Sequence, residues 1–206
     1  NAAGDAGLYL ESSPSSTFQC GYVSYVAPLD VDTSVPLVAN KWYFYTVTYK
    51  ASFVTDIGNV SCYLNGVRVG GMVMKGISRH GANTEEDFAG ARRDVAELVF
   101  PPGYIANTSA NLTFGAFGPP MSYLNGSVAN VQLYNSSLSS NSIFSLYVEG
   151  IGGAPLNLRS LVGWWPLNEN LTDYSGNNNN ATWVGVGVAG SNAFYINQWT
   201  GGYTTP

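Results

Sequence analysis

A two-residue turn between two apolar runs constrains this chain more than any other feature. The runs VSCYL and VRVG flank Asn65-Gly66. Asn-Gly favours the left-handed backbone of a type I′ turn, whose twist matches that of two antiparallel strands. The pattern predicts a β-hairpin. Side chains alternate along a strand, so Val60, Cys62 and Leu64 are expected on one face.

Further strands are predicted around this hairpin. Residues 42–49, WYFYTVTY, are all aromatic or β-branched, which favours a central strand with two apolar faces. Shorter strands are predicted at residues 8–10, at residues 18–27 and, near the C-terminus, at residues 193–196. Pro28 and residues 30–36 are predicted to form a loop.

Two short helices complete the prediction. Ser139 or Ser140 can cap a helix that has Ile143, Leu146 and Tyr147 on one face and ends at Gly150. The second helix is predicted at residues 83–87, NTEED, which resemble a capped first turn rich in acids. This helix would lie in a charged insertion, residues 75–105.

Composition excludes several classes of protein. Hydrophobic residues make up 45% of the 206 residues and charged residues only 10%, which is typical of a globular chain. The net charge of −5 argues against nucleic acid or an anionic membrane as partner. No apolar run reaches the roughly 18 residues that a membrane-spanning helix needs.

Cysteines and glycosylation motifs indicate the compartment. The pair Cys20 and Cys62 favours a disulfide, the alternative being two buried free thiols. The N-glycosylation motif N-x-S/T recurs at Asn59, Asn107, Asn111, Asn125, Asn135, Asn170 and Asn180. This density predicts a secreted glycoprotein, extracellular or at the cell surface. Asn125 is expected at an exposed hairpin tip.

Three parts of the chain resemble LamG-like domains, which have the concanavalin A-like lectin/glucanase fold. Residues 42–49 resemble the family strand W-h-h-V-A-x-x-Y, and residues 63–67 resemble its LYVNGxxV hairpin. Residues 112–116 and 124–139 resemble its L-x-I-G strand and its last hairpin, F-x-G-x-I-D-D-V-x-I-Y. Residues 163–169, GWWPLNE, and 173–177, DYSGN, resemble its opening GxWxLxE and D-x-S-G-N. The resemblance implies an all-β jelly-roll β-sandwich of antiparallel sheets.

The order of these motifs is rotated, because the family's opening motif comes last. We expect a core at residues 1–150, a connector at 151–159, and a displaced first-strand segment at 160–206 that completes the same or a neighbouring sandwich. Three explanations stay open: circular permutation, a repeat unit cut from a longer protein, or donation of a strand between subunits. A sandwich that lacks a strand exposes unpaired ladder groups, which a donated strand repairs.

The first expectation for function is therefore a non-enzymatic filament or surface subunit that polymerises head to tail. The expected assembly interface is Trp164, Trp165, Leu167, Trp183, Phe194, Ile196 and Trp199. Trp42 and Trp164 are expected in the core, whereas Trp165 is expected to point outward. The alternative is a monomeric glycan-binding adhesion module. A third class is a hydrolase of the same fold. Such enzymes carry clustered acids on one strand, and this chain has no such strand, so no catalytic residue is assigned.

Calcium is the one metal that the resemblance implies. LamG-like domains often bind Ca²⁺ through Asp, Asn and carbonyl oxygens, and Asp173, Asn177 and Asn179 offer such ligands. The paired Asp of the family's last hairpin is Ala129-Asn130 here, which removes charge. A polar turn held by an Asx-type hydrogen bond is the favoured interpretation of these residues.

Overall fold

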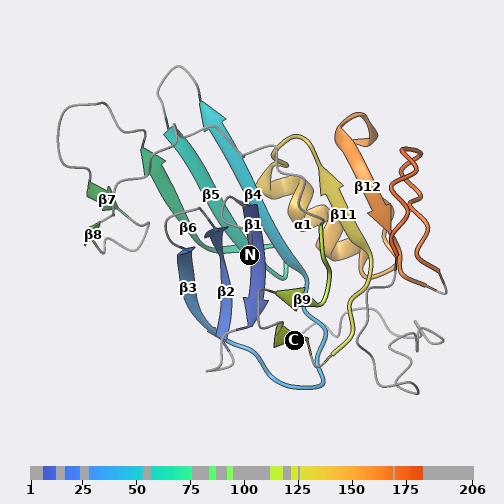
Figure 1. Ribbon diagram of the computed structural model, residues 1–206, viewed down its shortest axis with the longest axis horizontal. Coiled ribbons are helices and arrows are strands. Elements are labelled where there is room, and N and C mark those ends of the chain that lie inside the picture. The colour runs from blue at the N-terminus through green and yellow to red at the C-terminus, as the bar shows by residue number, and fades with distance from the viewer. Residues whose placement is uncertain are drawn as a thin grey trace. The chain divides into compact units, whose positions relative to one another are not determined.

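A computed structural model describes residues 7–12, 17–23, 28–52, 57–75, 84–86, 92–94, 112–117, 122–124, 126–168 and 170–182. This part of the chain consists mainly of antiparallel strands with one α-helix, which confirms the all-β class (Figure 1). The chain divides into two compact units, residues 1–111 and 112–206, which we describe separately. The strand predicted at residues 193–196 lies outside the described residues.

The first unit opens with a three-stranded antiparallel sheet in the order β1-β2-β3. Its strands are β1 (Gly7–Ser12), β2 (Thr17–Val23) and β3 (Pro28–Pro36). The first two confirm the strands predicted at residues 8–10 and 18–27. The third occupies the segment predicted as a loop.

The loop predicted at Pro28 and residues 30–36 was wrong, because the alternation of the side chains favours a strand despite the two prolines. Residues 29–35 read LDVDTSV, in which apolar or β-branched residues alternate with Asp and Ser. This period of two is typical of a strand. Pro28 and Pro36 stand at its two ends, where a missing N–H group interrupts the ladder least.

The second sheet of this unit has the order β4-β5-β6. Its strands are β4 (Tyr45–Ser52), β5 (Ile57–Leu64) and β6 (Val67–Lys75). The hairpin between β5 and β6 confirms the prediction, since Asn65 and Gly66 have φ angles of 51° and 76°. Asn65 also fixes the approach to β4: its backbone N–H donates to Phe44 O (2.8 Å) and its Oδ1 accepts from Phe44 N (3.0 Å).

The predicted strand at residues 42–49 is shifted and displaced from the sheet centre. β4 begins at Tyr45, and β5 lies between β4 and β6. Trp42 precedes the strand and is 45% exposed, so its expected place in the core was wrong. The reason is local, because the Phe44 backbone N–H bonds the Asn65 side chain instead of a neighbouring strand.

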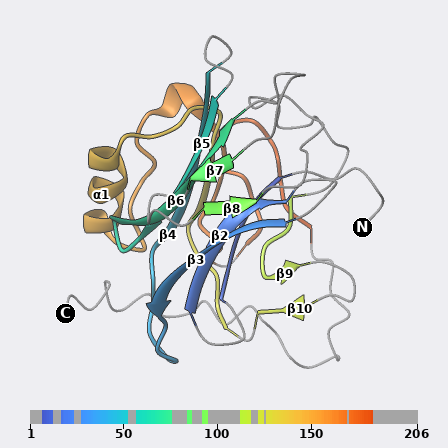
Figure 2. The ribbon, with the colours of Figure 1, turned by 90° about the vertical axis from the view of Figure 1, so that its left-hand side faces the viewer.

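The two sheets of this unit share one hydrophobic cluster. Its buried members come from β2, β5 and β6: Phe18, Cys20, Val60, Cys62, Leu64 and Met72. The turned view in Figure 2 shows the strands of the two sheets in separate layers. The shared face of Val60, Cys62 and Leu64 is thus confirmed. Phe18 stacks on Tyr45 of the facing sheet at 4.9 Å between ring centroids.

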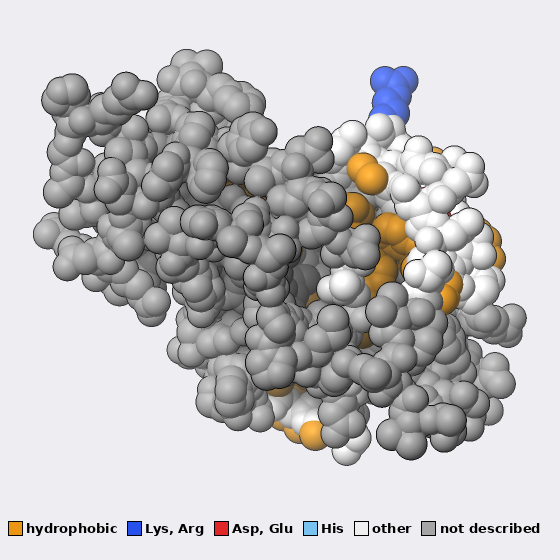
Figure 3. Space-filling model, in the orientation of Figure 1, with side chains coloured by type: hydrophobic (Ala, Val, Ile, Leu, Met, Phe, Trp, Pro, Cys, Tyr) orange, Lys and Arg blue, Asp and Glu red, His pale blue; other side chains and the backbone are white. Residues whose placement is uncertain are grey.

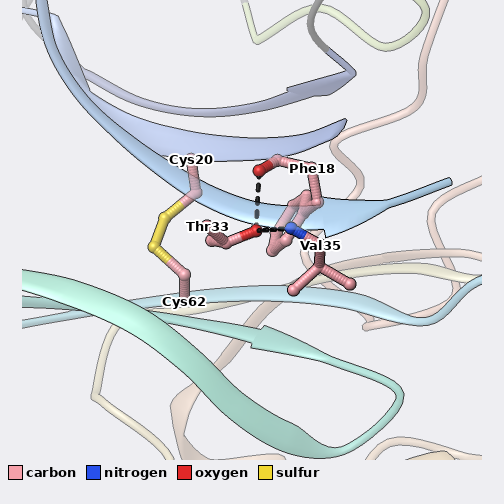
Figure 4. Close-up of a disulfide and its surroundings, with 5 residues drawn as sticks. All are labelled: Phe18, Cys20, Thr33, Val35 and Cys62. Carbon is pink, nitrogen blue, oxygen red and sulfur yellow. Dashed lines mark hydrogen bonds between the residues drawn. A yellow bond between two sulfur atoms is a disulfide. The ribbon is translucent and has the colours of Figure 1, made fainter. Parts of the chain in front are cut away.

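A disulfide between Cys20 and Cys62 crosses this cluster, which confirms the predicted bridge. Figure 4 shows it joining β2 to β5. The two Cα atoms are 6.2 Å apart, and both side chains are fully buried. Beside it, the Thr33 hydroxyl donates to Phe18 O at 2.8 Å. The bond therefore fixes one sheet to the other from inside the core.

The helix predicted at residues 83–87 is not formed. Residues Thr84–Glu86 are strand β7, which pairs antiparallel with β8 (Arg92–Asp94). The register places Glu85 opposite Arg93 and Glu86 opposite Arg92. The backbone pairing of these two short strands thus stands in place of the predicted helix.

The described residues of the second unit form two strand pairs, one α-helix and one short 3-10 helix. Strands β9 (Ala116–Phe117) and β10 (Ser122–Tyr123) pair with each other, as do β11 (Val131–Tyr134) and β12 (Leu161–Trp165). The predicted strand at 112–116 is therefore present only at its end. The predicted hairpin tip at Asn125 lies outside the described residues.

Helix α1 (Ser140–Glu149) confirms its prediction at both ends. The Ser139 hydroxyl accepts from Ser142 N at 3.1 Å, which satisfies one free N–H group of the first turn. Gly150 ends the helix with a φ of 80°. Ile143 and Leu146 are buried, as the predicted face requires. A 3-10 turn, η1 (Leu158–Ser160), then leads into β12.

No helix among the residues that the structure describes is long and apolar enough to cross a membrane.

Candidate functional site

The candidate site is the segment of residues 160–182, which contains β12 and the loop after it. We call it the clasped strand; all of it is described except residue 169. The segment was predicted to be a first-strand segment out of its usual order, and the structure shows that its strand β12 pairs with β11. Figure 1 shows β12 beside β11 of the same chain.

One edge of β12 pairs antiparallel with β11. The register joins Val131 to Trp165 and Gln132 to Trp164, with an irregularity between Leu133 and Tyr134. Two backbone hydrogen bonds extend the pairing at its ends, Asn130 N to Pro166 O (3.0 Å) and Asn135 N to Ser160 O (2.9 Å). β12 and β11 thus form an antiparallel pair within the second unit.

The loop after β12 covers the opposite edge of the strand. Trp164 N donates to Asp173 Oδ1 at 2.9 Å, and Trp164 O accepts from Tyr174 N at 2.7 Å. The carbonyl oxygen of Val162 accepts from Asn179 Nδ2 at 2.9 Å. These are the ladder groups that a third strand would otherwise use. The loop therefore blocks addition of a strand at this edge.

Asp173 is the centre of the loop. Its carboxylate is buried and accepts four hydrogen bonds: Oδ1 from Trp164 N and Ser175 N, Oδ2 from the Ser175 hydroxyl and Asn179 N, all at 2.8–2.9 Å. Burial raises the pKa of this carboxyl, but the four donors outweigh burial and lower the pKa from 3.8 to about 2. Asp173 is therefore ionised at neutral pH and holds the loop to β12.

These contacts do not fit a calcium ion. The four donors point at both oxygens of Asp173, so the lone pairs that would bind Ca²⁺ are already used. Asn177 and Asn179 turn their Nδ2 groups toward carbonyl oxygens of β12. No group of three or more His, Cys, Asp or Glu side chains suited to a metal occurs within the described ranges. We derive no chemistry through calcium.

Both tryptophans of β12 differ from expectation. Trp165, expected to point outward, is only 5% exposed; its Nε1 donates to Asn179 O at 2.8 Å and its ring lies 5.3 Å from that of Phe114. Trp164, expected in the core, is half-buried. The two side chains alternate as predicted, but Trp165 lies on the buried face and Trp164 on the more exposed face. Of the other residues expected at an assembly interface, Leu167 is buried. Trp183, Phe194, Ile196 and Trp199 lie outside the described residues.

Asn130 makes two contacts at this site that the sequence did not indicate. Its Oδ1 accepts from Trp164 Nε1 at 2.8 Å, and its Nδ2 donates to Gly153 O at 3.0 Å. It thus joins the clasped strand, β11 and the connector. The available signal was its place where the family carries Asp, together with the tolerance of Asn for its φ of 47°.

Four predicted glycosylation positions lie in the described residues. Asn135, Asn170 and Asn180 are exposed, whereas Asn59 is half-buried in β5, opposite Lys50 of β4 and Val73 of β6. The positions Asn107, Asn111 and Asn125 lie outside the described residues. Of the four described positions, the three in the second unit are therefore the exposed acceptors.

Comparisons of the chain with protein-family models, with curated proteins and with solved structures found no match.

Proposed function

We propose that the chain is a non-enzymatic extracellular structural protein, a subunit of a cell-surface filament, with a LamG-like jelly-roll architecture. Subunits would join by exchange of the clasped strand: β12 pairs with β11 of its own chain in the monomer and with β11 of the next subunit in the filament. The observation that carries this proposal is the construction of the clasped strand.

The clasped strand holds its own shape. Asp173, Asn177 and Asn179 all bond groups of the same segment, as does Trp165 Nε1. The hydrogen bonds that leave the segment go mainly to β11 and to Asn130, and the Trp165 ring also packs against Phe114. A segment that is folded by itself and attached along one edge can move to a neighbour with the same contacts remade, as in domain swapping.

The covered outer edge of β12 limits where a strand of a neighbouring subunit can add. A strand cannot add beside Asp173, so a neighbour gains access to the pair only by replacing β12 at β11. An exchange from each subunit to the next does not close on itself and yields a fibre. The helix α1 and the connector, residues 151–159, lie between the two strands and supply the chain length for the step.

The disulfide and the surface suit an exposed setting. A buried disulfide is characteristic of exported proteins, and the sequence carries glycosylation motifs along its length. On the face drawn in Figure 3, the described atoms are mostly backbone or uncharged polar side chains, with patches of hydrophobic side chains and one projecting basic side chain. Such a surface is compatible with a glycan coat.

One observation favours the alternative, a monomeric glycan-binding adhesion module. Tyr174 is 52% exposed, and its ring meets the edge of Trp164 at 6.0 Å. Its hydroxyl accepts from Asn170 Nδ2 at 3.1 Å. An exposed aromatic ring beside an amide is the usual surface for stacking and hydrogen bonding a sugar.

Electron microscopy of the native material, unreduced and unheated, tests the proposal. Strand exchange predicts long thin fibres with a repeat of a few nanometres, since one subunit adds per repeat. Separate particles of the mass of one glycosylated chain would contradict it. Saturable glycan binding by those particles, lost in Tyr174→Ala, would favour the alternative.

A further inference from the structure

We infer that Asn170 carries an N-linked glycan whose first sugar packs on the ring of Tyr174, four residues later. The inference rests on the proposed export of the chain, and it assigns one position, and one contact, among the glycosylation motifs. The side chains of Asn170 and Tyr174 contact each other, and they also contact Thr172 and Trp164, respectively.

The side chain of Asn170 is exposed and held in one orientation. Its Oδ1 accepts from Thr172 N at 2.9 Å, and Thr172 is the hydroxyl residue of the same motif. Its Nδ2, the atom that receives the sugar, donates to the Tyr174 hydroxyl at 3.1 Å. The acceptor nitrogen therefore already lies beside the aromatic ring, at a surface that a transferase can reach.

Transfer leaves this arrangement intact. A lipid-linked sugar (pyro)phosphate is the donor: a bond forms between Asn170 Nδ2 and C1 of the sugar while the C1–O bond to the phosphate breaks. The phosphate leaves with the bonding electron pair, and the nitrogen gives up one proton. One N–H remains on Nδ2 and can still donate to the Tyr174 hydroxyl, so the sugar is added next to the ring.

Tyr174 offers a fixed surface for that sugar. The ring is half exposed, yet its edge contact with Trp164 restrains it from below. Pyranose C–H groups pack against aromatic faces for the same electrostatic reason that edge-to-face aromatic pairs do. The Tyr174 backbone N–H donates to Trp164 O at 2.7 Å, so both the backbone and the ring of Tyr174 contact Trp164 of β12. By contrast, the Asn180 side chain accepts from Asp173 N and thus serves the clasp.

The experiment uses the whole chain, secreted from a host that N-glycosylates, with the glycans trimmed to the first sugar. Thr172→Ala removes the motif but keeps Asn170 and both of its hydrogen bonds, and Thr172→Ser keeps the motif. We expect glycopeptide mass spectrometry to find Asn170 occupied in the wild type and in Thr172→Ser only. We also expect hydroxyl-radical oxidation of Tyr174 to be several-fold lower in the wild type than in Thr172→Ala.

A second pair of variants tests the contact. The first sugar should raise the melting temperature by about 2–4 °C, the shift that corresponds to about 1 kcal/mol in a chain of this size. Tyr174→Phe should keep this rise and Tyr174→Ala should lose it. An empty Asn170 in a chain glycosylated elsewhere, equal oxidation of Tyr174 with and without the sugar, or an undiminished rise in Tyr174→Ala would each overturn the inference. Electron microscopy tests filament formation separately. An unoccupied Asn170 would therefore not contradict the proposed assembly, and a lack of filaments would not contradict the glycan at Asn170.

Discussion

The carboxylate of Asp173 accepts the backbone N–H of Trp164 at 2.9 Å, nine residues back along the chain. Through this bond a side chain takes the place of a neighbouring strand. The same carboxylate also accepts from Ser175 N and Asn179 N, so one residue fixes both the edge of β12 and the shape of the loop. The stability of the clasped strand should therefore depend strongly on this one side chain.

Asp173→Asn should destabilise the second unit by about 1–3 kcal/mol. The amide keeps the size of the side chain but replaces one acceptor oxygen with a donor, which leaves buried N–H groups without a partner. Thermal unfolding followed by tryptophan fluorescence measures the effect, because Trp164 and Trp165 lie in this segment. Glu149→Gln, the same chemical change at an exposed position on α1, is the matched control and should shift the transition little. Equal shifts in the two variants would contradict a special role for Asp173.

The lowered pKa of Asp173 predicts a loss of stability in acid. A carboxyl with a pKa of about 2 in the folded chain and about 3.9 in the unfolded chain stabilises the fold fully above pH 4. This contribution should disappear as the pH falls from about 4 to about 2. Denaturant unfolding at a series of pH values checks the slope. The comparison chain is Asp173→Asn, which should show a smaller dependence across this range; identical slopes would exclude Asp173 as the titrating group.

Calcium should have no effect on the clasped strand. Both oxygens of Asp173 are occupied by protein donors, so a cation gains no ligand there without breaking these bonds. Melting temperatures in millimolar Ca²⁺ and in excess chelator should agree within error. A rise in Ca²⁺ that disappears in Asp173→Asn would show that the loop rearranges around a metal and would reverse our conclusion.

Removal of the disulfide should weaken the first unit. Cys20 and Cys62 are 42 residues apart in the chain, and the loop-entropy relation then gives about 4 kcal/mol. The double variant Cys20→Ala/Cys62→Ala should therefore unfold at a clearly lower denaturant concentration. Without a reductant the native pair should not be alkylated in either the folded or the unfolded chain, because neither sulfur is a free thiol. Ready alkylation of the folded, unreduced protein would contradict the bridge.

Local patterns in the sequence were sufficient for several elements. Asn65-Gly66 and the cap at Ser139 each act within a few residues, so the hairpin and helix α1 could be predicted with their ends. The strand β3 could also have been predicted, had its alternation been weighed above its flanking prolines. The helix predicted in the charged insertion was wrong for the opposite reason. Its acids resemble the first turn of a helix, and the sequence does not show that Arg92 and Arg93 lie across from them.

The site was harder to predict because its contacts are long-range. The motif around Asp173 was recognised, but both a cation site and a polar turn agree with the same residues. The choice depends on which atoms point at the carboxylate, and Trp164 N is one of them. Which face of β12 is buried likewise depends on Asn130, 34 residues away, which holds the Trp164 indole. Neither relation leaves a local periodic signal.

The central claim is that β12 pairs with β11 of a neighbouring subunit in the assembled protein. Gln132 and Trp164 are register partners, and the Trp164 backbone groups face the loop, so this is a non-hydrogen-bonded pair with the short Cα separation that a disulfide needs. The decisive measurement is a non-reducing gel of oxidised filaments that carry Gln132→Cys and Trp164→Cys in one chain, with each single variant as control. Strand exchange predicts a ladder of covalent multimers that collapses on reduction. A single monomer band from fully cross-linked material would show that each chain keeps its own β12 and would contradict the claim.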